Sequence, residues 1–146
     1  MPSIIIRDLR IEDYDALIAL WQESKLPFKP EGRDRKEKIG KEIQKSNAIY
    51  LVAQLDSKII GSVFGTHDGR KGWINRVAVA PAYRRQGIAH RLIREAESRI
   101  TNLGIEVIAC LIEDGNLSSI EVFKSLGYSQ NSPHLLYFSK KKHKEA

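Results

Sequence analysis

Residues 77–89 read VAVAPAYRRQGIA, and they carry the chain from an apolar strand into a helix. The strand ends before a proline, two arginines follow, and Gly87 stands just before the helical run 90–103. The first backbone N–H groups of a helix have no partner within the helix, and the helix dipole favours negative charge at that end. A glycine at this turn leaves the main chain open to a large anion because it has no Cβ. The stretch therefore predicts a cradle for a diphosphate, with Arg84 and Arg85 beside it.

Two other phosphate-binding patterns do not fit this turn. No Gly-Lys-Ser/Thr closes it, as a P-loop requires, and the dinucleotide fingerprint needs three glycines. On spacing alone, a plain strand-to-helix turn with its arginines in solvent stays open as an alternative. The pattern Arg84-x-x-Gly87-x-Ala89 after the strand resembles the coenzyme A signature of the GNAT superfamily of N-acetyltransferases. The resemblance implies that acetyl-CoA is the co-substrate, and the coenzyme-contacting residues that it implies here are Val77, Ala78, Val79, Arg84, Arg85, Gln86, Gly87, Ile88 and Ala89.

Length and composition favour one globular domain. A chain of 146 residues with 42% hydrophobic content can bury a sizeable core, so we expect a single domain over residues 1–146. No apolar run approaches the length of a membrane span, and the first residues lack the pattern of a signal peptide. We therefore expect a cytoplasmic protein without a membrane partner. The single cysteine, Cys110, excludes an internal disulfide and lies in the apolar run 107–112, which favours a core position.

The net charge of +6 suits an anionic ligand. Coenzyme A carries a diphosphate and a further phosphate, which a cationic surface attracts. Nucleic acid would be attracted in the same way, but no interleaving of aromatic and basic residues supports it as a partner. Part of the charge lies in residues 140–146, which we expect to form a flexible basic tail. We expect no metal.

The order of the expected elements extends the resemblance along the chain. Hydrophobic patterning and turn signals predict helices over 11–21, 33–45, 90–103 and 116–126, and strands over 4–7, 49–53, 59–64, 73–79, 106–112 and 135–138. This order resembles that of the GNAT fold, an α/β (α+β) architecture with a mixed central β-sheet flanked by about four helices.

A second motif reads Asn116-x-x-Ser119-x-x-x-Phe123-x-x-x-Gly127-Tyr128. Taken by itself it predicts a helix capped by Asn116 and ended by Gly127. The resemblance implies in addition that Asn116 bonds the pantetheine arm and that the small Ser119 leaves room beside it. The resemblance also places Phe123 among the coenzyme-contacting residues. Phe123 departs from the family pattern, since much of the family has a tyrosine there whose hydroxyl steadies the departing thiolate. Either another donor serves, or the thiolate leaves unaided.

The resemblance implies direct attack of a neutral amine on an acetyl thioester, with the Val77 N–H polarising the acetyl carbonyl. Some relatives carry a glutamate where this chain has Trp73, so the general base is unassigned. The candidates are Glu113, Asp114, His67 and His134. We expect an N-acetyltransferase, with the acceptor open among a protein N-terminus, a lysine side chain and a small amine. A non-catalytic coenzyme A-binding module is the alternative, and a monomer or a homodimer fits either.

Overall fold

The structure, a computed structural model, describes residues 3–130 and 135–146. Within these residues a five-stranded sheet has the order β1-β2-β3-β4-β5. Neighbouring strands are antiparallel from β1 to β4, and β4 and β5 are parallel. The mixed sheet that the sequence predicts is confirmed, and its strands are Ile4–Asp8 (β1), Ala48–Leu55 (β2), Lys58–His67 (β3), Lys71–Val79 (β4) and Val107–Ala109 (β5).

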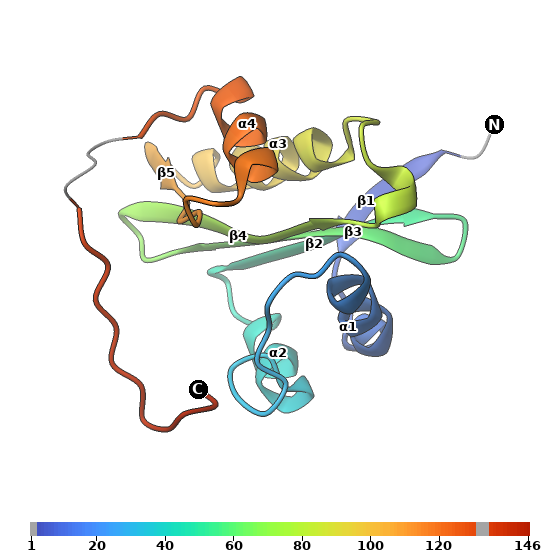
Figure 1. Ribbon diagram of the computed structural model, residues 1–146, viewed down its shortest axis with the longest axis horizontal. Helices are drawn as coiled ribbons and strands as arrows, with labels where there is room; N and C mark the ends of the chain where they lie inside the picture. Colours follow the sequence, from blue (N-terminus) through green and yellow to red (C-terminus); the bar gives the residue numbers. More distant parts are fainter. Residues whose placement is uncertain (1–2, 131–134) are drawn as a thin grey trace.

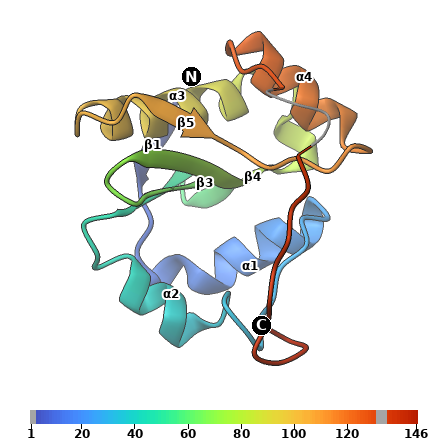
Figure 2. The ribbon, with the colours of Figure 1, turned by 90° about the vertical axis from the view of Figure 1, so that its left-hand side faces the viewer.

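Helices cover both faces of this sheet, as predicted. Figure 1 shows α1 and α2 on one face and α3 and α4 on the other, and Figure 2 shows the same layers from the side. A 3-10 turn over Ile11–Asp13 leads into α1, and the helices span Tyr14–Glu23 (α1), Lys36–Glu42 (α2), Ile88–Thr101 (α3) and Leu117–Ser125 (α4). In the part of the chain that the structure describes, no helix is long and apolar enough to cross a membrane.

The long helix α3 lies close against the sheet because glycines face it. A Cβ on Gly61 would lie 2.9 Å from Leu92 Cδ1, and one on Gly72 would lie 2.8 Å from Ile100 Cγ2. Both glycines therefore let the helix approach the backbone of β3 and β4. Its buried side chains are Ile88, Leu92, Ile93, Ala96 and Ile100. Burying such an aliphatic side chain contributes about 1.5–3 kcal/mol, so this face fixes where α3 begins relative to the end of β4.

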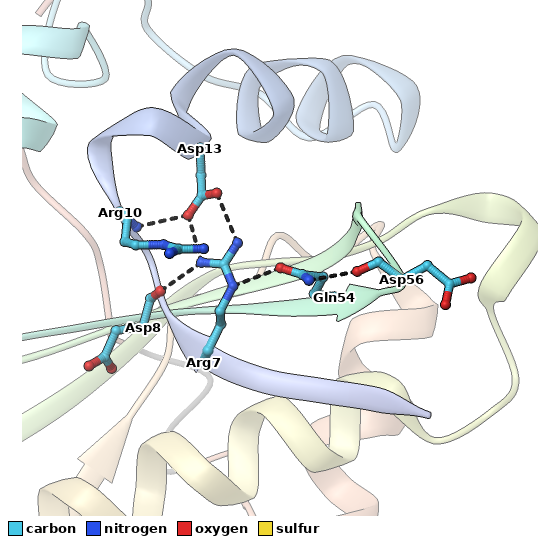
Figure 3. Close-up of polar contacts among 6 residues, drawn as sticks. All are labelled: Arg7, Asp8, Arg10, Asp13, Gln54 and Asp56. Atoms are coloured by element: carbon cyan, nitrogen blue, oxygen red, sulfur yellow. Dashed lines mark hydrogen bonds and ion pairs between the residues drawn. The ribbon is translucent and has the colours of Figure 1, made fainter. Parts of the chain in front are cut away.

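A polar cluster attaches the start of α1 to the edge of the sheet formed by β1 (Figure 3). The guanidinium of Arg7 on β1 donates to both carboxylate oxygens of Asp13, at 2.8 and 2.9 Å, and its Nε donates to Gln54 on β2 at 2.8 Å. The backbone N–H of Arg10 donates to the same carboxylate at 2.9 Å. The hydrogen bond from Arg7 holds the pKa of Asp13 below its usual range. The cluster thereby fixes the start of α1 against β1 and β2.

The predicted strand over residues 135–138 is wrong. Within the described residues this segment belongs to no strand, and its four apolar side chains are 73–84% exposed. Figure 1 shows the last residues passing away from β5, and the chain ends against the loop before α2, where a Cβ on Gly32 would lie 2.0 Å from the Glu145 carbonyl oxygen. A strand needs a neighbouring backbone to pair with, so apolar composition without a partner does not form one. The expected strand over 106–112 is shorter than predicted, and so is the expected helix over 33–45.

Candidate active site

The turn between β4 and α3 has the backbone geometry of an anion cradle. A 3-10 turn over Pro81–Tyr83 leads to Arg85 and Gly87, whose φ angles are +64° and +77°. Gly87 is the N-cap of α3, and the first helical bond runs from Arg91 N to Gly87 O at 3.1 Å. The N–H groups that precede this bond have no acceptor within the helix and point out of its end. Ile88 is 2% exposed, so only its backbone can face a ligand.

The surface of the cradle is open. A Cβ built on Gly87 would meet no atom within 4 Å, so the glycine is favoured here by its positive φ alone, and it leaves free space above the turn. The side chains of Arg85 and Gln86 are exposed beside it. The Arg84 side chain folds back instead, and its Nε donates to the Val79 carbonyl at 3.1 Å. Within the described residues, only Arg85 of the two neighbouring arginines therefore has its side chain free beside the cradle, while the Arg84 side chain bonds the end of β4.

The last two strands separate next to this turn. Residues Lys71–Trp73 of β4 pair with Val107–Ala109, which is the whole of β5. Beyond Trp73 the strand β4 continues to Val79, and among the described residues no β5 partner faces that part. Apart from the Val79 carbonyl, which accepts from Arg84, its backbone groups on the β5 side are therefore available to a ligand that lies between the strands.

A β-bulge lies in the separated part of β4. Ser62 on β3 is opposite Ala78, whereas Phe64 is opposite Asn75, so β4 has one residue more than β3 between the two pairs. Arg76 takes up this extra length with a φ of +53°. The peptide unit that joins Arg76 to Val77 is therefore turned out of the regular ladder.

The helix α4 contains the second motif, and its capping role is confirmed. The Asn116 Oδ1 accepts from the Ser119 N–H at 3.2 Å. Phe123 is a core side chain, 5% exposed, packed edge-to-face on Tyr128 with ring centroids 4.9 Å apart. The Tyr128 hydroxyl donates to Glu97 on α3 at 2.7 Å, and burial together with this bond raises its pKa. The proton of this neighbouring tyrosine is thus already committed to Glu97.

The candidate bases fall in different places. Glu113 and Asp114 are exposed in the turn between β5 and α4. His67 lies opposite Gly72, five residues before Val77, which is about 16 Å along a strand. Its Nδ1 accepts from the Gly69 N–H at 3.1 Å, a bond within the hairpin turn. His134 lies outside the described residues, and within those residues no group of three or more His, Cys, Asp or Glu side chains could hold a metal ion.

Residues 14–128 match the model of the acetyltransferase (GNAT) family. The chain belongs to this family. An acetyltransferase of Pectobacterium atrosepticum is 31% identical over 123 residues, which is 84% of this chain and 86% of that protein. The PaiA N-acetyltransferase of Thermoplasma acidophilum, solved in complex with coenzyme A, is 25% identical with a TM-score of 0.79, covering 90% of this chain and 94% of that one. The aminoglycoside N-acetyltransferase AAC(6')-Iy has a TM-score of 0.80 and covers 97% of each chain, and at 19% identity it shows the shared fold.

Family membership makes the protein an acetyltransferase, and the fold prediction is confirmed by these solved neighbours. The matched residues include the separated strands, the cradle and α4 of the GNAT domain.

A buried polar cluster, not predicted from the sequence, lies on the face of the GNAT sheet that α1 and α2 cover. Arg76 Nη2 lies 2.7 Å from Asp34 Oδ2, and the Trp21 Nε1–H donates to Ser62 Oγ at 3.0 Å. The available signal is Ser62 itself, a hydroxyl within the otherwise apolar run of β3. Buried polar side chains are rare enough to indicate a hydrogen-bonded role.

Proposed function

We propose that the protein transfers the acetyl group of acetyl-CoA to a primary amine by direct attack. The observation that carries the proposal is an open anion cradle at the start of α3, next to the separated end of β4, in a GNAT family member. A relative named as an acetyltransferase and a neighbour solved with coenzyme A support it.

In the proposed complex, main-chain groups make most of the contacts with coenzyme A. The diphosphate takes the N–H groups of Ile88 and Ala89, with Arg85 and Gln86 at its side. The pantetheine arm lies between the strands along residues 77–79. Ala78 is 5% exposed and its N–H and C=O face β3 in the ladder, so the arm takes its main-chain contacts from Val77 and Val79. Because Arg84 already donates to the Val79 carbonyl, a pantetheine amide has to share or displace that bond.

Asn116 and Ser119 border the arm on the α4 side in this proposal. The Asn116 Oδ1 is used by the helix cap, which leaves its Nδ2 as the group that can donate to a pantetheine carbonyl. Phe123 on the same helix is buried in the core. The helix α4 is held to the start of α3 by His90 Nε2 and Ser125 Oγ, 2.7 Å apart, so the cap and the cradle are fixed relative to each other.

The transfer requires a neutral amine. The amine nitrogen forms a bond to the acetyl carbon, the carbon–sulfur bond breaks, and the thiolate of coenzyme A leaves with the electron pair. The amine proton passes to a base or to water. A thiol has a pKa of about 8.5, so its anion leaves without a protein acid near neutral pH. We assign no residue as the base, and Glu113 and Asp114 come first for substitution because they lie beyond β5.

The test is turnover with acetyl-CoA and a mixed pool of peptides, polyamines and amino acids. Release of free thiol above the hydrolysis background, with an acetylated amine found by mass spectrometry, supports the proposal and names the acceptor class. Tight binding of coenzyme A without thiol release from any amine would favour a non-catalytic coenzyme A-binding module instead.

The pH dependence of the rate reports the acceptor and any hidden base. With no base, acetylation accelerates with pH until the acceptor is neutral, near pH 8 for an α-amine and about 10.4 for a lysine side chain. The measurement is initial rate against pH at saturating acetyl-CoA. A plateau reached by about pH 7 with a lysine acceptor, well below the pKa of that amine, contradicts the mechanism without a base.

A further inference from the structure

Ser62 makes two hydrogen bonds in the core, and their directions are fixed. The side chain is 0% exposed. The indole Nε1–H of Trp21 on α1 donates to the Ser62 Oγ at 3.0 Å, and an indole nitrogen can only donate. The serine hydroxyl therefore uses its own proton toward the carbonyl of Arg76, 2.8 Å away. The carbonyl of Arg76, the bulge residue, is thus fixed by Ser62 on β3, which is itself fixed by Trp21 on α1.

The Arg76 side chain is held on the same face. Its Nη2 lies 2.7 Å from the Asp34 carboxylate, and its guanidinium carbon lies 5.4 Å from the centre of the Trp21 ring. Asp34 is 4% exposed and also accepts from the Lys29 N–H at 2.7 Å. A left-handed conformation costs a residue with a Cβ about 1–2 kcal/mol, so the strained backbone at φ +53° needs such anchors.

These anchors determine where the next N–H points. A trans peptide unit is planar, and its C=O and N–H point in opposite directions. The Arg76 carbonyl points to Ser62 on β3, so the N–H of Val77 points away from β3, toward the side of β4 on which β5 lies. That is the side where β4 extends beyond its pairing with β5.

We propose that Ser62 and Arg76 are positioning residues that aim the Val77 N–H at the acetyl carbonyl of the bound thioester. The inference rests on the proposed function. Neither side chain touches the ligand; both fix the peptide plane that carries the donor. A donor that is already oriented needs no reorganisation as charge develops on the carbonyl oxygen, which is the condition under which such donors accelerate acyl transfer most.

The decisive variant is Ser62→Ala, with Leu51→Ala as its control. Leu51 is also 0% exposed, on β2, but it lies opposite Val63 and therefore on the other face of the sheet from Ser62. Removing an oxyanion donor costs about 100- to 1000-fold in kcat, so misaiming one is expected to lower kcat about tenfold or more. The KM for acetyl-CoA and the Kd of coenzyme A stay within about twofold, because the cradle is unchanged. The control lowers the melting temperature but leaves kcat of the folded enzyme unchanged.

A second pair separates backbone conformation from anchoring. Arg76→Gly keeps the positive φ without strain and removes the contacts to Asp34 and Trp21, so kcat falls. Arg76→Lys keeps a cation for Asp34 and recovers part of the loss. A kcat of Ser62→Ala or Arg76→Gly within twofold of the wild type overturns the proposed role of that residue. A loss of kcat matched by an equal weakening of coenzyme A binding also overturns it, since the effect is then on the whole site.

Failure of the proposed function would look different. If the wild type binds coenzyme A but acetylates no amine, kcat cannot be measured. The test is then the ratio of the dissociation constants of coenzyme A and acetyl-CoA, compared between the wild type and Ser62→Ala. Ser62→Ala must reduce the preference for acetyl-CoA, and an unchanged ratio overturns the inference.

Discussion

The substitution Gly87→Ala adds one methyl group to the cradle. Its effect on the free energy of unfolding reports backbone strain, and its effect on the Kd of coenzyme A reports whether the methyl group blocks the ligand. The φ of Gly87 is +77°, and a Cβ there meets no protein atom within 4 Å. Gly87→Ala therefore has no clash to relieve, and its cost in stability is the left-handed conformation alone, about 1 kcal/mol. For a chain of this length that lowers the melting temperature by about 3 °C.

The matched control is Gly104→Ala. Gly104 follows the other end of α3, has a φ of +87°, and likewise has no atom within 4 Å of a built Cβ. Both variants should lose the same stability. If the diphosphate rests on the α3 end, the methyl group at position 87 keeps it from the N–H groups and raises the Kd of coenzyme A at least about tenfold, or 1.4 kcal/mol. The Kd of the control stays at the wild-type value.

The assay is isothermal titration with coenzyme A, paired with a thermal melt of each variant. Equal Kd values for wild type, Gly87→Ala and Gly104→Ala would refute the cradle as the anion site, whatever the melts show. A much larger loss of stability at position 87 than at position 104 would refute the strain argument.

Three further outcomes are expected. Burial raises the pKa of Cys110 to about 11, so alkylation by iodoacetamide at pH 8 should run roughly 100-fold slower in the folded protein than in urea; equal rates would contradict it. Phe123→Tyr should leave kcat within a few-fold, and a gain of about 100-fold would show that the natural chain lacks an acid that it could use. Because Leu136 and Phe138 are 76% and 84% exposed, replacing both with serine should change the free energy of unfolding by under about 0.5 kcal/mol. A larger loss in a denaturant titration would mean that this segment packs as a strand after all.

The parts of the fold with local signals could be predicted from the sequence. The turn over 77–89 and the start of α3 depend on neighbouring residues, and so does the cap at Asn116. Gly127 ends α4 with a φ of +93°, as a left-handed terminator does. In each case the residue that forms the feature lies within one or two turns of it.

The parts of the fold that depend on partners distant in the sequence could not be predicted. The segment 135–138 has the composition of a strand, but composition does not say whether an edge is there to receive it. The bulge at Arg76 could not be predicted either. One extra residue interrupts the alternation of buried and exposed side chains, and in a sequence this looks the same as the end of the strand. Trp21, Ser62 and Asp34 meet Arg76 or one another across 14 to 42 residues of sequence, and no local spacing indicates that meeting.

The proposed site is built largely from main-chain groups, and this changes where sequence constraint should fall. A strand residue such as Val79 offers the same N–H and C=O with any side chain that fits the strand. The residues that fix the backbone have no such freedom: Gly87 by its φ, Ser62 by its two hydrogen bonds, and Arg76 by its ion pair. Substitutions that abolish activity should therefore cluster on residues that set the direction of a peptide group, including side chains buried on the face of the sheet away from α3.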